Sequence, residues 1–319
     1  SRLPHDMKKA KKAEDATEVA ANAQAYLERY EVDQAMKLYR RAVKLEPENT
    51  AILDAFGEAC LQAGEREEAC KVFTRSVELK PDGAAGRYMY LGQLLEGVDA
   101  IRCFERGVAI LRTERAAAEQ RSGSREELRQ AWADTTHALA TGLCSAAEIY
   151  LTDACDEPDA EERCEALATE ALALVEPLQE QTLAEPYVTT ASLRLSQQRG
   201  EEAQPLLQKA LDVVSNCDES ALPPFDCRLS LSKMLMEIGR PADALELLQM
   251  LRLEDDDSLE LRYLLVCAAM QADELELATD ELAKAMEFAQ TPACPEDEQQ
   301  WVEQLQELQR DMSEAHMEG

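Results

Sequence analysis

Apolar and small residues recur at helical spacing along nearly the whole chain. Ala35, Tyr39 and Ala42 lie four and three residues apart, and the same spacing returns 34 residues later. Such spacing places side chains on one face of an α-helix. Pro47 and Pro81 follow the two segments and stop them, because proline cannot continue the helical hydrogen-bond ladder. We therefore expect helices in tandem and no β-sheet.

The 34-residue period is typical of the tetratricopeptide repeat (TPR), a unit of two antiparallel helices. Ala23 and Gly57 fall where the two helices of such a repeat cross closely, and an aromatic residue fills the space beside the crossing. Looser copies follow at 91–107, 128–177, 187–210, 231–251 and 260–288. The sequence predicts an all-α fold: a right-handed superhelical solenoid of about seven TPR helix pairs with a C-terminal capping helix.

The same pattern predicts the organisation of the chain. We expect a basic tail at 1–15, a solenoid that forms a single domain over 16–293, and a capping helix over 294–319. Polar residues near 116–127 predict a mobile loop inside the solenoid. The capping helix carries an apolar stripe on one face, at Trp301, Leu305, Leu308 and Met312.

Charge is distributed unevenly along the chain. The net charge is −31, from 33 basic and 64 acidic residues. Residues 1–150 hold 22 bases and 25 acids, a net charge of −3, which leaves −28 for residues 151–319. Because nucleic-acid binding depends on lysine and arginine neutralising phosphates, we expect no direct contact with nucleic acid. A basic protein is the complementary partner, although a large net charge also serves solubility alone.

The chain lacks the motifs of common catalytic sites. It has no Gly-rich phosphate loop, HExxH or GxSxG motif, and its ten cysteines include no CxxC pair. His137 and Cys144 share a helix face, but no third group orients them. We expect no enzyme activity, no metal and no cofactor. No apolar run is long enough to span a membrane, and we expect no signal peptide. The predicted location is the cytoplasm and nucleus.

The concave face of a TPR solenoid is lined chiefly by the first helix of each repeat. When the register of the two clearest repeats is projected along the chain, acids and a few apolar residues fall on that face. The acids would attract a basic client, and the apolar residues would anchor it. The predicted client-binding residues are Asp54, Glu58, Met89, Tyr90, Gln93, Glu96, Glu148, Asp153, Glu185, Val188, Asp226 and Glu237.

Two stretches carry a more particular resemblance. One is Ala146-Ala147-Glu148-Ile149-Tyr150-Leu151-Thr152-Asp153, which an acidic loop follows, and the other is the short turn within 91–101. Together with the number of repeats and the acidic second half, they make the chain resemble the fungal-type dedicated chaperone of the fourth large-subunit ribosomal protein.

The resemblance implies a client. This client is a basic ribosomal protein of the large subunit, whose long internal loop is unstructured until rRNA folds it. The chaperone would shield the loop from aggregation and degradation and release it to the pre-60S ribosome. Contacts with the pre-ribosome and an import receptor would then run through the client. Two alternatives stay open: a TPR scaffold that joins subunits of a complex, and a histone-type chaperone.

Overall fold

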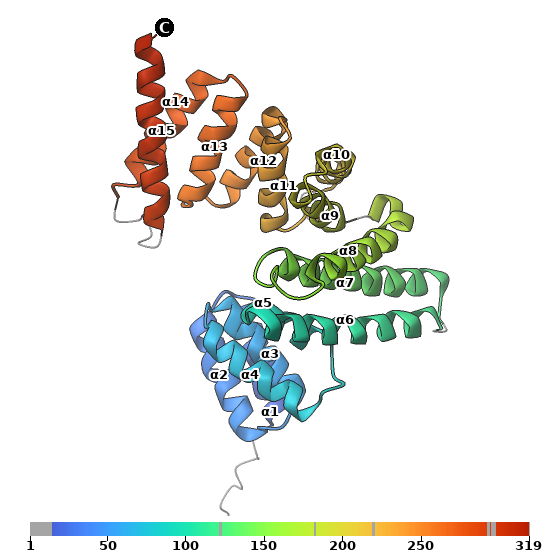
Figure 1. The fold of residues 1–319 in the computed structure, drawn as a ribbon. Coiled ribbons are helices and arrows are strands. Elements are labelled where there is room, and N and C mark those ends of the chain that lie inside the picture. The colour runs from blue at the N-terminus through green and yellow to red at the C-terminus, as the bar shows by residue number, and fades with distance from the viewer. Residues whose placement is uncertain are drawn as a thin grey trace, which may run out of the picture. The chain divides into compact units, whose positions relative to one another are not determined.

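The computed structural model describes residues 15–120, 123–181, 183–218, 221–291, 294 and 298–318. Within these residues the chain forms α-helices, short 3₁₀ segments and no strand, which confirms the all-α prediction (Figure 1). None of the helices in this part of the chain combines the length and apolarity needed to cross a membrane.

The chain divides into two compact units, residues 1–160 and 161–319. The predicted fourth helix pair is therefore shared between them, and the prediction of a single domain over 16–293 stays a prediction. The helices of the first unit are α1 (Ala16–Leu27), α2 (Val32–Leu45), α3 (Thr50–Gln62), α4 (Arg66–Leu79), α5 (Gly86–Leu94), α6 (Gly97–Glu119) and α7 (Arg125–Leu151).

The second unit contains α8, which starts at the boundary residue, and the helices that follow it. They are α8 (Ala160–Val175), the 3₁₀ helix η1 (Glu176–Gln181), α9 (Glu185–Ser196), α10 (Gly200–Asn216), α11 (Phe225–Glu237), α12 (Pro241–Glu254), α13 (Leu259–Gln271), α14 (Leu275–Phe288) and α15 (Gln299–Glu318).

Successive helices pack as the repeat pattern predicts. Within the first unit α1 packs on α2, α3 on α4 and α5 on α6, and within the second α9 packs on α10, α11 on α12 and α13 on α14. The close crossings lie at Gly57 and Gly92, where an added Cβ would stand 2.5 Å from Phe73 and 2.6 Å from Phe104. Each ring belongs to the second helix of the same repeat, which confirms the predicted register.

The turn within a pair also repeats. Gly64 and Gly239 adopt left-handed backbone angles, with φ of 74° and 77°, and Tyr30 takes φ of 60° at the corresponding place in the first repeat. Glycine is the residue that this conformation favours. Tyr30 is also 92% exposed, so its ring gains no burial in return for the strained angle.

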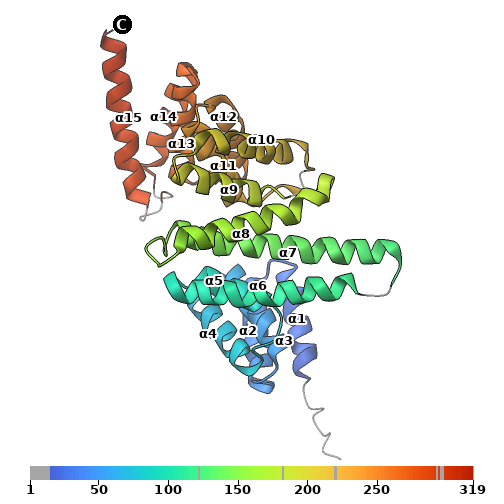
Figure 2. The ribbon, with the colours of Figure 1, turned by 45° about the vertical axis from the view of Figure 1, so that its right-hand side comes forward.

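The loop predicted near 116–127 is shorter than expected, and this part of the prediction is wrong. Helix α6 continues through Ala116–Ala118 to Glu119, because consecutive alanines favour the helix. Helix α7 starts at Arg125 behind a capping box, in which the Ser124 hydroxyl accepts a hydrogen bond from the Glu127 amide and the Glu127 carboxylate accepts one from the Ser124 amide. These two long helices lie side by side (Figure 2). Residues 121 and 122 lie outside the described residues.

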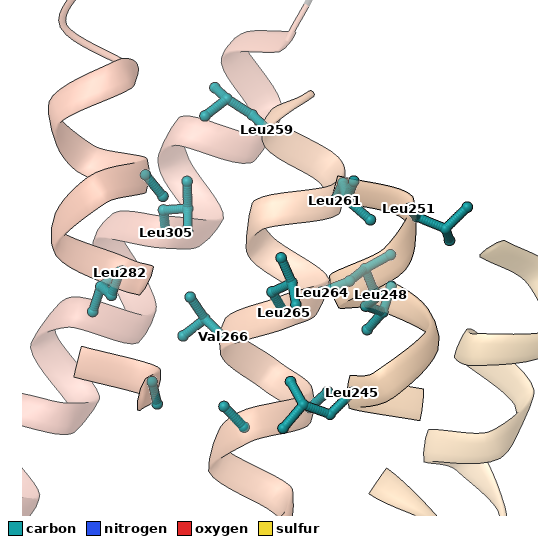
Figure 3. Close-up of a cluster of buried hydrophobic side chains, with 14 of the residues drawn as sticks. Leu245, Leu248, Leu251, Leu259, Leu261, Leu264, Leu265, Val266, Leu282 and Leu305 are labelled. Atoms are coloured by element: carbon teal, nitrogen blue, oxygen red, sulfur yellow. The ribbon is translucent and has the colours of Figure 1, made fainter. Parts of the chain in front are cut away.

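The core of the second unit is rich in leucine. Side chains from α12, α13, α14 and α15 meet there, among them Leu248, Leu265, Leu282 and Leu305 (Figure 3). Helix α15 packs on both α13 and α14, and the Trp301 ring lies tilted against the Tyr263 ring, with centroids 5.3 Å apart. The capping role is therefore confirmed, with the helix starting at Gln299. Residues 295–297, and the basic tail at 1–14, lie outside the described residues.

Candidate functional site

Asp54 on α3 belongs to an internal ion pair. The Arg87 guanidinium donates to Asp54 Oδ2 at 2.6 Å, and the Ser76 hydroxyl donates to Asp54 Oδ1 at 2.5 Å. The side chain of Arg87 is only 4% exposed. We call Asp54, Ser76 and Arg87 the arginine latch. Both carboxylate oxygens therefore have partners inside the fold, and the role of Asp54 in client binding stays a prediction.

Glu58 lies one turn after Asp54 on the same helix, outside the latch. Partial burial, together with the negative charge of Asp54, raises the pKa of the Glu58 carboxyl. Glu58 also lies close enough to Tyr39 and Tyr90 to help burial raise the pKa of both phenols. Tyr90 stacks on Phe73 with ring centroids 5.1 Å apart. The structure thus brings together three predicted residues, Asp54, Glu58 and Tyr90.

Met89 has a packing role that the sequence pattern does not reveal. Its methyl group would stand 2.0 Å from a Cβ added at Gly107 of α6, and its sulfur 3.1 Å from one added at Gly142 of α7. The side chain therefore fills a slot that two glycines leave between these helices. Part of the Met89 side chain is thus used in packing, and its role as an anchor for a client stays a prediction.

Four further predicted residues of the first unit lie at its surface. Gln93 at the end of α5 and Glu96 at the N-cap of α6 are exposed, and the Gln93 carbonyl accepts a hydrogen bond from Arg66. Glu148 in the last turn of α7 and Asp153 in the following turn are also exposed. Their role in client binding stays a prediction.

The second unit holds the other four predicted residues. Asp226 and Glu237, at the two ends of α11, are exposed, and Glu185 is half-buried in the first turn of α9. Val188 is only 4% exposed, which corrects its assignment as an anchor. Helix α9 is buried on most of its circumference from Pro186 to Ala191, and the lack of any charged residue in that stretch is a signal that sequence reasoning missed.

Buried arginines are the main feature that sequence analysis missed. Arg228 on α11 forms two hydrogen bonds with the Glu254 carboxylate, at 2.6 and 2.7 Å. Arg262 on α13 pairs with the Asp256 carboxylate at 2.9 Å and also donates to the Asp256 carbonyl. These two arginines lie 34 residues apart, so the repeat period was a signal for them. Part of the acidic run at 254–257 therefore serves the fold.

Two observations concern the chemical groups of the described residues. Among the residues that the structure describes, no group of three His, Cys, Asp or Glu is placed to hold a metal ion. Burial raises the pKa of the Cys60 thiol to about 12, so it stays protonated and is a poor nucleophile near neutral pH. What the surface does present is exposed carboxylates on helices of both units.

Comparison with known proteins gives a class and then a family. No family model matches the chain. It is 35% identical over 183 residues to the "Probable assembly chaperone of rpl4" of Schizosaccharomyces pombe, which covers 56% of this chain and 50% of that protein. It is 33% identical over 247 residues to the protein of the same name from Emericella nidulans. That alignment covers 76% of this chain and 51% of that protein. The chain thus spans about half the length of the curated relatives it matches.

One solved structure extends the likeness to the fold. The structure titled "Assembly Chaperone of RpL4 (Acl4) (Residues 1-338)" superposes with a TM-score of 0.71 at 32% identity, covering 84% of this chain and all of that chain. The paired helices and their glycine–aromatic crossings define a TPR solenoid protein. Within that class, the chain belongs to the family of assembly chaperones of RpL4.

Proposed function

We propose that this protein is a dedicated chaperone of a basic ribosomal protein of the large subunit, the homologue of rpl4. The observation that carries the proposal is the 32% identity to a solved assembly chaperone of RpL4 over the whole of that chain. The net charge of −31 supports it, because a ribosomal protein that binds rRNA is basic. The client would be shielded from aggregation and degradation until it joins the pre-60S ribosome.

Charged residues and apolar contacts contribute to client binding in different ways. Exposed ion pairs contribute about 0.2–1 kcal/mol each, so eight of them supply only about 2–8 kcal/mol. Nanomolar affinity requires about 12 kcal/mol, and ordering a flexible client segment raises the requirement. Exposed acids therefore set the association rate and the choice of partner. Tyr90, which is half-buried and aromatic, supplies contact area beside Glu58.

The proposal includes where the protein acts and through which contacts. It works in the cytoplasm and nucleus, holds no cofactor and catalyses no reaction. Contacts with the pre-ribosome and an import receptor run through the client rather than through nucleic acid or a membrane. The two alternatives, a scaffold for a complex and a histone-type chaperone, predict different copurifying proteins.

Purification of the full chain from growing cells tests the proposal directly. Mass spectrometry should find rpl4 as the dominant partner. Histones, or a fixed set of other subunits without rpl4, would refute it. In a second assay, purified rpl4 should stay soluble at low salt in the presence of the chain and precipitate in its absence.

A charge-reversal pair separates a specific surface from bulk charge. One variant reverses Glu58, Glu96 and Glu237 to lysine, all exposed residues of the predicted surface. The control reverses three exposed glutamates on second helices of the repeats, which changes the charge equally: Glu201, Glu246 and Glu287. The first variant should slow association with rpl4 more than the second. Equal losses would show that net charge alone attracts the client.

A further inference from the structure

The Arg87 guanidinium joins three segments of the first unit. One of its nitrogens donates to the carbonyls of Ser76 and Lys80 in the last turn of α4 and beyond it, at 3.1 and 3.2 Å. A second of its three nitrogens donates to Asp54 of α3. A positive charge is favourable at a helix C-terminus, where free carbonyls point outward. Arg87, which stands on α5, thus fixes that helix to the two before it.

The surroundings are built for this side chain. A Cβ added at Gly83 would stand 2.5 Å from the Arg87 guanidinium, so the group occupies space that only glycine leaves open. Breaking the Asp54 contact would leave a buried positive charge without its counter-charge, which is a costly state. A client that pairs with Asp54 would have to share its charge with Arg87.

Glu58 differs from Asp54 in its exposure and in its partners. It is exposed, and its carboxylate is not part of the latch. Its charge acts on Tyr90, which is three residues after Arg87 on α5 and stacks on Phe73 of α4. The latch ties α5 to α3 and α4, and therefore helps to hold Tyr90 in place.

We propose that Arg87 is a positioning residue that withdraws Asp54 from client binding and leaves Glu58 as the acid of α3 that a basic client meets. This inference rests on the proposed function for its client. It predicts that two acids one turn apart on one helix, with the same charge, affect binding in different ways. Glu58 acts on association, whereas Asp54 acts on the stability of the first unit and on how firmly α5 is held.

Three neutral substitutions in the full chain test this division: Asp54→Asn, Glu58→Gln and Ser76→Ala. The first two remove the same charge, and the third removes a hydrogen bond of the latch without changing the charge. Thermal unfolding, hydrogen exchange of the α5 amides, and association and dissociation rates with purified rpl4 are measured at 50 and 500 mM salt.

Asp54→Asn should lower the melting temperature by about 5 °C or more and speed both α5 exchange and rpl4 dissociation. Ser76→Ala should do the same to a smaller extent, and it serves as the test if Asp54→Asn does not fold. Glu58→Gln should leave exchange unchanged and should not lower the melting temperature, because it removes a carboxylate that partial burial and Asp54 disfavour. It should slow association about 1.5- to 5-fold at low salt only.

Two outcomes would overturn the inference. In one, Asp54→Asn retains the wild-type melting temperature and slows association as Glu58→Gln does, which would make Asp54 a client contact. In the other, Ser76→Ala and Asp54→Asn both leave α5 exchange unchanged, which would mean that no latch exists. If wild-type protein does not bind rpl4, the proposed function fails, and melting and exchange still test the latch.

Discussion

Replacing Gly57 by leucine should destabilise the first unit, and the structure gives the magnitude. A Cβ at this position would stand 2.5, 2.6 and 2.8 Å from three atoms of the Phe73 ring, closer than real Cβ contacts occur. The backbone fixes the Cβ position, so no rotamer of the new side chain relieves the clash. Phe73 is fully buried and stacks on Tyr90, which limits its retreat. Overpacking of this kind costs about 1–3 kcal/mol, and we expect the upper end.

Differential scanning calorimetry measures the effect. A loss of about 3 kcal/mol in a unit of this size lowers its melting temperature by roughly 6–12 °C. If the two units melt separately, only the transition of the first unit should move. The control is Gly200→Ala in α10, where an added Cβ has nothing within 4 Å, so melting should stay the same or rise slightly. An unchanged melting temperature for Gly57→Leu would show that the helices of this repeat do not cross at Gly57 and that its register is wrong.

Three further predictions concern the second unit. Asp256→Asn removes the carboxylate charge that pairs with the buried Arg262 and should cost roughly 1 kcal/mol in urea unfolding, whereas Asp257→Asn should cost nothing measurable. The hydrogen bond from the buried Arg228 guanidinium lowers the pKa of the Glu254 carboxyl. The stability that this ion pair adds is therefore complete above the usual glutamate pKa, and it is lost as the pH falls through the lowered pKa. Between pH 6 and pH 3 the melting temperature of the wild type should fall, and that of Glu254→Gln should fall less. Trp301→Ala should weaken the packing of α15 by roughly 2–4 kcal/mol, seen as faster hydrogen exchange in that helix.

The helical fold could be predicted from the sequence because its determinants are local. Gly57, Phe73 and the prolines at 47 and 81 recur at fixed spacing, and each acts within its own repeat. The crossing of the two helices at Gly57 needs no information from the rest of the chain. The capping box of Ser124 and Glu127 is equally local, although the polar residues around it favour a loop when they are considered by composition alone.

The candidate site could be predicted only in part, because its determinants are not local. Asp54 and Arg87 are 33 residues apart, and no repeat pattern says that they meet. Met89 has the helical position of an exposed anchor, yet the slot that receives it depends on glycines in two later helices. Helical periodicity shows which face a residue is on, and it does not show what stands opposite that face.

The placement of the arginines explains how so acidic a chain can retain specificity. With 64 acids and 33 bases, long-range attraction for a basic partner would be similar over much of the surface. Buried arginines divide the acids into two groups: some, such as Asp54 and Glu254, have their charge balanced by a buried arginine, and others, such as Glu58 and Glu237, face solvent without such a partner. Only the second group can steer a client toward one surface. The few bases therefore help to determine where the many acids act.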